Sequence, residues 1–430
     1  GNWYWTYGGD YGPKDVPSFG NFCCNGLVNA VREPHPHLLE VKKIYQNIKS
    51  TLVDKKNLTI RVKNWFDFSD LNEYLLHWSV TGDDGTIVAE GSKEVTCAPH
   101  AVVDITLGAV KLPKTLREAY LNLSWTRVKA TPLVTSDWEV AYDQFVLPVS
   151  KNSWSGKPAK AGNTTFVVDE ATGALKSLCL DGEELLASPI TLSLFRPATD
   201  NDNRDQNGAK LWRQAGLDHL TQKVVSLKEG KNKTTVKADI LNAEGKKIGN
   251  AEFIYALNRD GSMKVQTTFE PDTSLVKSMA RLGITFEMKD TYENVTYLGR
   301  GEHETYTDRN QSGKIGVYKT TPERMFHYYV VPQSTGNRTD VRWLQLTDEH
   351  GKGCWIEANS FFQFSTFPFS DVILEKARHI NELKRDGKIT IHLDAEQAGV
   401  GTATCGPGVL PSYLVPLTKQ TFDFTIYPVK

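Results

Sequence analysis

Residues 196–208, RPATDNDNRDQNG, hold the densest group of side chains that could do chemistry. Three Asp and three Asn place carboxylate and amide oxygens in a single loop. Such oxygens can wall a sugar site or bind calcium, or they can fold the loop onto its own backbone in Asx turns. The spacing differs from the calcium pattern D-x-D-x-D-G followed by a glutamate, which disfavours calcium. The stretch is therefore either a solvated, turn-rich loop or a polar wall for a sugar.

A second charged stretch, YLGRGEHETYTDRN, covers residues 297–310. Glu302 and His303 could work together as an acid/base pair. The alternative is an internal network of ion pairs, because cations such as Arg300 and Arg309 nearly balance the anions of the stretch. We favour the ion-pair network over the catalytic pair.

The cysteines offer a third kind of chemistry. Cys23 and Cys24 are adjacent in NFCCNGLV, which suggests a reactive thiol, a metal site or a disulfide. A disulfide between neighbours requires a strained ring, and thiolate sites for zinc need residues between their ligands. Cys405 lies in GVGTATCGPG (399–408) with no His or Asp within ten residues to activate it. We expect free thiols throughout, and a flexible glycine loop at 399–408.

The elements that position these residues begin with a Gly/Pro-rich loop over residues 1–20, which is typical of the mouth of a site. A helix is predicted to start near Pro36, because apolar side chains then recur at helical spacing. The apolar face of this helix is narrow, and it must pack against a part of the protein that is not obvious in this chain. Because the chain also begins with Gly rather than Met, we expect a piece cut from a larger protein. The apolar face consists of Leu38, Val41, Ile44, Tyr45 and Ile48.

From about residue 57 the apolar period changes to two, which indicates strands. About 90 residues of this kind predict an immunoglobulin-like β-sandwich. Residues 150–163 are polar and rich in Gly, Ser, Lys and Pro, so they are predicted to be a linker. A second all-β region follows to the C-terminus, and its length predicts a large two-sheet β-sandwich. The only helices expected there are at 209–215 and 380–384. The first strands are predicted in NLTIRVKNW, YLLHWSVTG, AVVDITL, AYLNLSWTRVK and WEVAYDQFVLPV.

The net charge and the aromatic content indicate which classes of partner to expect. The 50 Lys and Arg against 51 Asp and Glu leave a net charge of −1, which gives no electrostatic reason to bind nucleic acid or an anionic membrane. The 10 Trp, 16 Tyr and 18 Phe suit sandwich cores and sugar-stacking surfaces. The sequence has no apolar run of transmembrane length and no signal-peptide pattern. We expect no nucleic-acid or membrane partner.

Eight motifs occur in this order along the chain: WTYGGDYG, NFCCNGLV, REPHPHLLEVKKIYQ, YLLHWSV, RPATDND, YLGRGEHETYTDR, YVVPQ and GVGTATCGPG. In this order and spacing they resemble the C-terminal part of the large bacterial β-galactosidases of glycoside hydrolase family 2. The resemblance implies a mainly β fold. Residues 1–48 would be the end of a (β/α)8 catalytic barrel, and 49–155 an immunoglobulin-like β-sandwich. Residues 156–430 would be a large terminal sandwich, similar to galactose mutarotase.

The resemblance also implies an activity, which is hydrolysis of terminal β-galactosides with retention. That chemistry uses two carboxylates, and both family Glu residues, like the magnesium ligands, belong to barrel segments upstream of residue 1. No catalytic residue is carried over, and we expect this chain alone to be inactive. Phe22, through its carbonyl, and Asn25, through its side chain, match two ligands of a sodium ion near the sugar. We expect no cofactor in this chain, and sodium and magnesium in the full-length parent.

The resemblance places two further loops at the substrate rim, beside Asn25. Asp200, Asn201 and Asp202 match the terminal-domain loop that reaches the pocket. Well-known members place a sugar-stacking Trp near the position of Gly406, where this sequence reads GTATCGPG and includes Cys405.

Other functions remain open on the sequence alone. The sandwich could be a standalone carbohydrate-binding or mutarotase-like module, for which His303, His327 and His392 are the candidate acids, or a structural interaction domain. The expected partner is a galactoside bound by the full-length parent, which we expect to be a homo-oligomer. The compartment is unknown, either cytoplasmic or periplasmic.

Overall fold

The computed structural model describes residues 3–158 and 163–429, and every structural statement below refers to these residues. They form two compact units. The smaller unit consists of His37–Lys157 with Lys314–Val317, and the larger unit of the other described residues. The predicted linker at 150–163 lies partly outside the described residues. The predicted three-part division of the chain stays a prediction.

The smaller unit contains two antiparallel sheets, one of three strands in the order β1-β2-β5 and one of four in the order β4-β3-β6-β7. Buried apolar side chains from both sheets form one core that includes Ile60, Leu76, Leu121 and Trp125. This is the seven-strand, two-sheet arrangement predicted from the alternation. The strands are β1 (Ile48–Asp54), β2 (Thr59–Asn64), β3 (Tyr74–Gly82), β4 (Ile87–Glu94), β5 (Val102–Thr106), β6 (Glu118–Arg127) and β7 (Glu139–Pro148), with the short 3-10 helix η2 (Leu71–Glu73).

Two elements of the smaller unit differ from the sequence prediction. The helix α1 (Pro36–Ile44) begins at the predicted proline but ends before Ile48, which instead opens β1 as a fully buried residue. Ile48 fits a helical spacing and an alternating one equally well, and burial in the sandwich core decides for the strand. β4 was missed because its residues are mostly charged or exposed, as is common for an edge strand.

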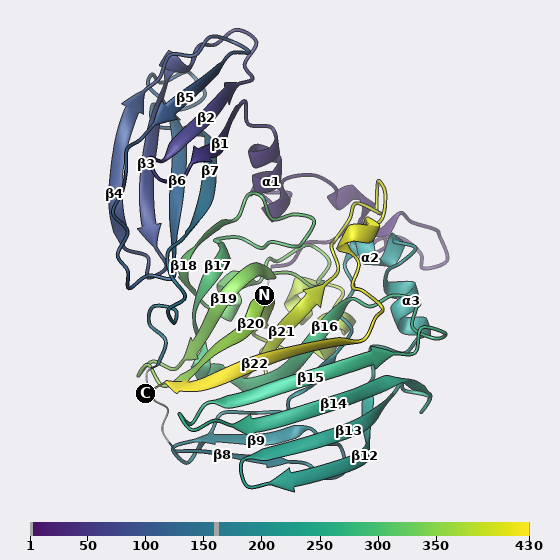
Figure 1. The fold of residues 1–430 in the computed structure, drawn as a ribbon. Helices are drawn as coiled ribbons and strands as arrows, with labels where there is room; N and C mark the ends of the chain where they lie inside the picture. Colours follow the sequence, from purple (N-terminus) through teal and green to yellow (C-terminus); the bar gives the residue numbers. More distant parts are fainter. Residues whose placement is uncertain (1–2, 159–162, 430) are drawn as a thin grey trace. The chain divides into compact units, whose positions relative to one another are not determined.

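The larger unit contains a three-stranded sheet in the order β10-β9-β8 and a twelve-stranded, mostly antiparallel sheet. The main path of the large sheet is β11-β16-β21-β20-β22-β15-β14-β13-β12, and the long strands β12–β15 can be followed side by side in Figure 1. The prediction of a mainly β chain is confirmed. The strands are β8 (Thr164–Val168), β9 (Leu175–Leu180), β10 (Glu183–Glu184), β11 (Thr191–Ser193), β12 (Thr221–Gly230), β13 (Lys233–Leu241), β14 (Lys247–Leu257), β15 (Met263–Pro271), β16 (Arg281–Lys289), β17 (Asn294–Gly301), β18 (Lys314–Thr320, of which residues 318–320 belong to this unit), β19 (Arg338–Thr347), β20 (Gly353–Phe367), β21 (Lys388–Gln397) and β22 (Gln420–Val429).

Helices in the larger unit are short and lie in the connections. The predicted helix at 209–215 is present as α3 (Ala209–Gln214), and the one near 380 is a single 3-10 turn, η4 (Ile380–Glu382). Within the described ranges, no helix has both the length and the apolar character needed to cross a membrane. The remaining helices are η1 (Gly20–Cys24), α2 (Asp200–Arg204), η3 (Asp290–Tyr292), α4 (Pro322–Met325), α5 (Asp371–Lys376) and η5 (Pro411–Tyr413).

Candidate functional site

Three loops of the larger unit that are far apart in sequence meet through the residues predicted for the substrate rim. Asn21 Nδ2 donates to Asp200 Oδ2 at 2.8 Å. Asn25 Nδ2 lies 3.8 Å from Cys405 Sγ. Asn201 Nδ2 donates to the Gly401 carbonyl at 2.9 Å. The structure thus brings residues 21–25, 200–201 and 401–405 together, and their part in binding substrate stays a prediction.

The acidic loop folds as a capped helical turn. Thr199 caps α2 by accepting from the Asp202 amide, and the Asp202 side chain accepts from the Thr199 amide in return, which is a capping box. Asp202 is 2% exposed, and both of its oxygens accept from Arg196, at 2.7 and 3.0 Å. Asp200 and Asn201 stay partly exposed. Asp202 therefore holds the loop in place, and its two neighbours bond to the other two loops, Asp200 to Asn21 and Asn201 to Gly401.

The glycine loop at 399–408 was predicted to be flexible, yet three side chains from other segments hold it. Arg196 donates to the carbonyls of Ala398 and Gly399, both at 2.8 Å. Asp308 accepts from the Gly401 amide at 2.8 Å, and Asp205 accepts from the Val409 amide at 2.6 Å. These anchors were missed because the sequence does not show which carboxylates turn inward.

The glycines of this loop permit the close approach of those carboxylates. A Cβ added at Gly399 would lie 2.5 Å from the Asp308 carboxylate, and one at Gly408 would lie 2.6 Å from Asp205 Oδ1. Both distances are shorter than any real Cβ contact, so a larger residue would displace the anchor. Glycine here serves close packing against an acid, in addition to the turn at Gly401, whose φ is +55°. Gly406 is exposed at the tip of the loop.

The charged stretch at 297–310 forms the ion-pair network that we favoured. Arg309 pairs with the buried Glu304, which also accepts from the Gly336 amide at 2.7 Å. Burial alone would raise the pKa of Glu304, but the charge of Arg309 and the Gly336 amide outweigh it and lower that pKa. His303 Nε2 lies 2.7 Å from Ser312 Oγ. The anions of this stretch thus hold local structure.

The cysteines are free thiols, as predicted. The Sγ atoms of Cys23 and Cys24 lie 3.8 Å apart. Burial, and then the neighbouring thiol of Cys23, raise the pKa of Cys24 to about 11, which disfavours the nucleophilic thiolate.

The predicted sodium ligands lie in and just after η1. Carbonyl and amide oxygens, such as those of Phe22 and Asn25, are the kind of ligand that a hard cation prefers. Two oxygens are nevertheless fewer than such an ion requires. In the part of the chain that the structure describes, no group of three or more His, Cys, Asp or Glu side chains could hold a metal. The donor set of this chain thus fits sodium in kind but not in number.

The N-terminal loop is fastened by His379, a residue that the sequence did not single out. The His379 ring stacks on Tyr7 with centroids 5.1 Å apart, and Tyr4 meets it edge-on at 5.2 Å. Its Nε2 lies 2.9 Å from an oxygen of Asp10, and its Nδ1 lies 3.2 Å from Glu382. We call these five residues the His379 latch, because they join residues 4–10 to the segment around η4.

The His379 latch is expected to depend on pH. Burial alone would lower the pKa of His379, but the hydrogen bonds to Asp10 and Glu382 raise it above 6.5. Backbone amides, then His379, lower the pKa of Asp10 below 3.8 and that of Glu382 below 4.5. The raised His pKa stabilises the latch below pH 6.5, and this stabilisation is lost as the pH rises through the folded-state pKa. The lowered acid pKa values stabilise it above about pH 4.5, and that contribution is lost on acidification.

An NMR titration of the His379 imidazole in the full chain would test this dependence. Asp10→Asn should lower the His379 pKa toward 6.5, because it removes the charge beside Nε2. The matched control is Asp15→Asn, which alters an exposed carboxylate of the same loop. A His379 pKa that is the same in both variants would contradict the latch.

Comparison with known proteins gives three family matches in chain order. Residues 1–50 match "Glycosyl hydrolases family 2, TIM barrel domain". Residues 60–148 match "Beta-galactosidase, domain 4", and residues 160–427 match "Beta galactosidase small chain".

Curated relatives named "Beta-galactosidase" match nearly the whole chain. The protein of Priestia megaterium is 31% identical over 93% of this chain and 40% of its own length. That of Aeromonas hydrophila is also 31% identical, over 93% of this chain and 41% of its own length. That of Actinobacillus pleuropneumoniae is 26% identical over 96% and 42%, respectively. The chain thus spans about two fifths of the length of these relatives.

Proposed function

The chain belongs to the β-galactosidase small-chain family, and from this premise we propose that it is the carboxy-terminal part of a retaining β-galactosidase. The whole protein would hydrolyse terminal β-D-galactosides. The observation that carries the proposal is the ordered match of three consecutive segments to glycoside hydrolase family 2 and its β-galactosidases. In this proposal the present chain scaffolds and rims the active site, and the two catalytic Glu residues belong to the rest of the parent.

The loop cluster supports a rim rather than a catalytic centre. A retaining glycosidase needs two carboxyl groups about 5 Å apart on either side of the glycosidic bond, one of them as a nucleophile. The acids in and beside the three loops instead accept hydrogen bonds that hold those loops. Their partners are Asn21 and Gln333 for Asp200, Arg196 for Asp202, the Val409 amide for Asp205, and the Val400 and Gly401 amides for Asp308.

The N-terminal loop supports the presence of a covering partner. Its side chains Trp3, Phe19 and Phe22 are 95%, 90% and 53% exposed. The rings of Phe19 and Phe22 are neighbours, with centroids 6.4 Å apart, and adjacent exposed aromatic side chains are typical of an interaction surface. We propose that the remainder of the parent covers them and adds its catalytic residues beside Asn25 and Asp200.

Hydrolysis of a nitrophenyl β-galactoside and calorimetry with galactose test the proposal. The parent protein is expected to hydrolyse the galactoside, whereas this chain alone should neither hydrolyse it nor give heat with galactose. Saturable heat from the chain alone would instead favour a carbohydrate-binding module. Acceleration of galactose mutarotation by the chain alone would favour a mutarotase-like enzyme. Either result would overturn the proposal.

The proposal extends to ions and assembly. The parent is expected to require sodium and magnesium, to form a homo-oligomer, and to bind neither nucleic acid nor membranes. Removal of both ions with a chelator and a sodium-free buffer should abolish the parent's hydrolysis.

A further inference from the structure

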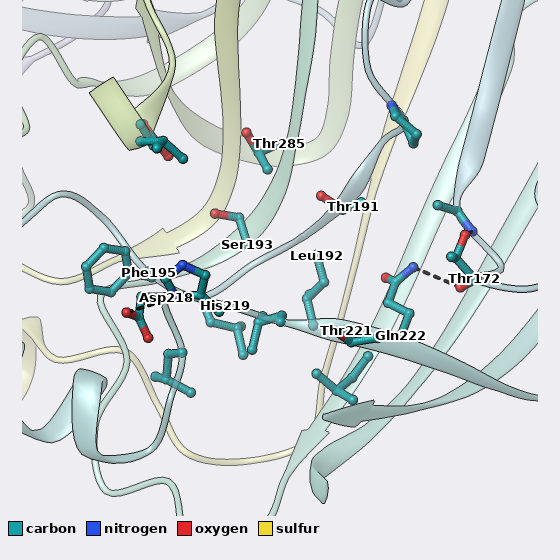
Figure 2. A pocket seen from close by; sticks show the side chains of 18 of the residues that line it. Thr172, Thr191, Leu192, Ser193, Phe195, Asp218, His219, Thr221, Gln222 and Thr285 are labelled. Atoms are coloured by element: carbon teal, nitrogen blue, oxygen red, sulfur yellow. Dashed lines mark hydrogen bonds and ion pairs between the residues drawn. The ribbon is translucent and has the colours of Figure 1, made fainter. Parts of the chain in front are cut away.

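The larger unit contains a cavity of about 550 Å³ that the loop cluster does not use. Figure 2 shows Phe195 and Gln222 on opposite sides of it, with Leu192 between them. Gln222 Nε2 donates to the Thr172 carbonyl at 3.1 Å, a bond drawn as a dashed line in Figure 2. Its Oε1 has no hydrogen-bond partner among the described residues but also almost no accessible surface, so a molecule in the cavity could not reach it. The lining therefore does not indicate a particular ligand.

A more specific arrangement of side chains lies in η1, where two thiols are in contact. Cys23 and Cys24 are both free, and their Sγ atoms lie 3.8 Å apart. Cys23 is exposed and Cys24 is partly exposed, so the pair can be reached from solvent. The other four cysteines are single along the sequence. The pair thus presents two soft sulfur donors at one accessible place.

Contacts on either side of the pair hold it in position. Asn21, near the start of η1, donates to Asp200 at 2.8 Å. Asn25, directly after η1, has its Nδ2 3.8 Å from Cys405 Sγ. Both ends of this short helix are therefore tied to other loops before any ligand binds. Such preorganisation lowers the entropic cost of binding.

The gap between the two sulfurs fits a single bridging atom. In a tetrahedral zinc site, bonds of about 2.3 Å place two sulfurs of the same ion about 3.8 Å apart. The Sγ atoms of Cys23 and Cys24 are separated by 3.8 Å. Zinc itself needs four ligands, and within the described ranges no group of three or more His, Cys, Asp or Glu side chains could hold a metal. The bridging atom must therefore be one that needs only two sulfurs from the protein.

A trivalent arsenic atom that carries one organic group meets this requirement. It forms three bonds in a pyramid, its bonds to sulfur are similar in length to those of zinc, and the organic group already occupies one of the three. When phenylarsonous acid reacts with two thiols, two As–O and two S–H bonds break and two As–S bonds form. The hydroxyl groups leave with the thiol protons as two molecules of water, and arsenic stays trivalent. The reaction consumes neutral thiols, so the raised pKa of Cys24 does not oppose it.

From these observations we propose that Cys23 and Cys24 form a binding site for trivalent arsenicals with one organic group, in which a single arsenic atom is bonded to both sulfurs. Its place in η1, between Asn21 and Asn25, puts the bound arsenical beside the loop cluster. The proposal does not depend on the proposed galactosidase function, because it rests on the two thiols alone.

Mass spectrometry of the intact full chain after treatment with phenylarsine oxide, which hydrates to phenylarsonous acid, tests the proposal. One adduct per chain is expected, with a mass gain of one phenylarsenic group in place of two hydrogens. The adduct should persist in excess glutathione, a monothiol, and be removed by 2,3-dimercaptopropanol, because only a second dithiol competes with two bonds to one atom. Absence of the adduct, or its removal by glutathione as readily as by the dithiol, would overturn the proposal.

Three serine variants locate the site. Cys23→Ser and Cys24→Ser each leave a single thiol, so the glutathione concentration that removes half of the adduct should fall about 100-fold or more, the usual loss when a second linked bond is missing. Cys405→Ser is the matched control, because it removes an exposed single thiol of the neighbouring loop and should leave the adduct unchanged. An equal loss in Cys405→Ser, or full retention in Cys23→Ser and Cys24→Ser, would overturn the assignment to this pair.

Discussion

Replacement of Arg196 by methionine is expected to lower the free energy of unfolding of the larger unit by about 3–5 kcal/mol, the cost of breaking a buried ion pair from one side. Arg196 is fully buried and makes two hydrogen bonds to Asp202 and two to the carbonyls of Ala398 and Gly399. Methionine leaves the Asp202 carboxylate buried without its counter-charge. Urea unfolding followed by circular dichroism should show a lower midpoint with an unchanged slope.

Two further variants distinguish this effect from a general loss of charge. Arg385→Met breaks the half-exposed pair with Glu323 and should cost at most about 1 kcal/mol, since solvent already screens that pair. Arg196→Met combined with Asp202→Leu should recover part of the lost stability, because no charge is then left buried. A cost for Arg196→Met no greater than that for Arg385→Met would contradict the assignment of this pair as the anchor of the loops at 199–205 and 398–401.

Replacement of Trp125 by alanine should destabilise the smaller unit by about 3–5 kcal/mol, as is typical of large aromatic truncations in cores. Trp125 lies on β6, is fully buried between the two sheets, and its Nε1 has no hydrogen-bond partner among the described residues. The loss is therefore one of packing, because no hydrogen bond of the indole is given up. Thermal unfolding by calorimetry should show a lower transition temperature for this unit.

The matched control is Trp65→Ala. Trp65 is 50% exposed, with Lys63 over its ring at 5.1 Å, so its truncation should change stability by less than about 1 kcal/mol. Comparable losses in the two tryptophan variants would show that the two-sheet core does not depend on Trp125.

Sequence periodicity located most strands of the smaller unit because it is a local property. Alternation between polar and apolar residues placed β2, β3, β5, β6 and β7 within about two residues of their observed ends. It failed where two periods coincided, at Ile48, and where an edge strand had few apolar residues, in β4. In both places, tertiary burial selected the element.

The candidate site was predictable only in part. The resemblance picked out Asn25, Asp200, Asn201 and Cys405, and the structure brings these loops into contact. It gave no indication that Asp202 is buried against Arg196, or that His379 fastens the N-terminal loop. Each of these contacts depends on the direction in which a side chain points in the folded chain. Residue types alone do not specify that direction.

By itself the sequence determined the β-rich class of the chain, its two-sheet smaller unit and its family resemblance. Strand alternation and the order of motifs are properties of consecutive residues, so they can be read directly along the chain. Only the tertiary structure decided that the glycine loop is anchored. Arg196 reaches Gly399, and Asp205 reaches Val409, across about two hundred residues. A hydrogen bond between such distant segments forms only after the sheet has brought them together, so no local pattern in the sequence could show it.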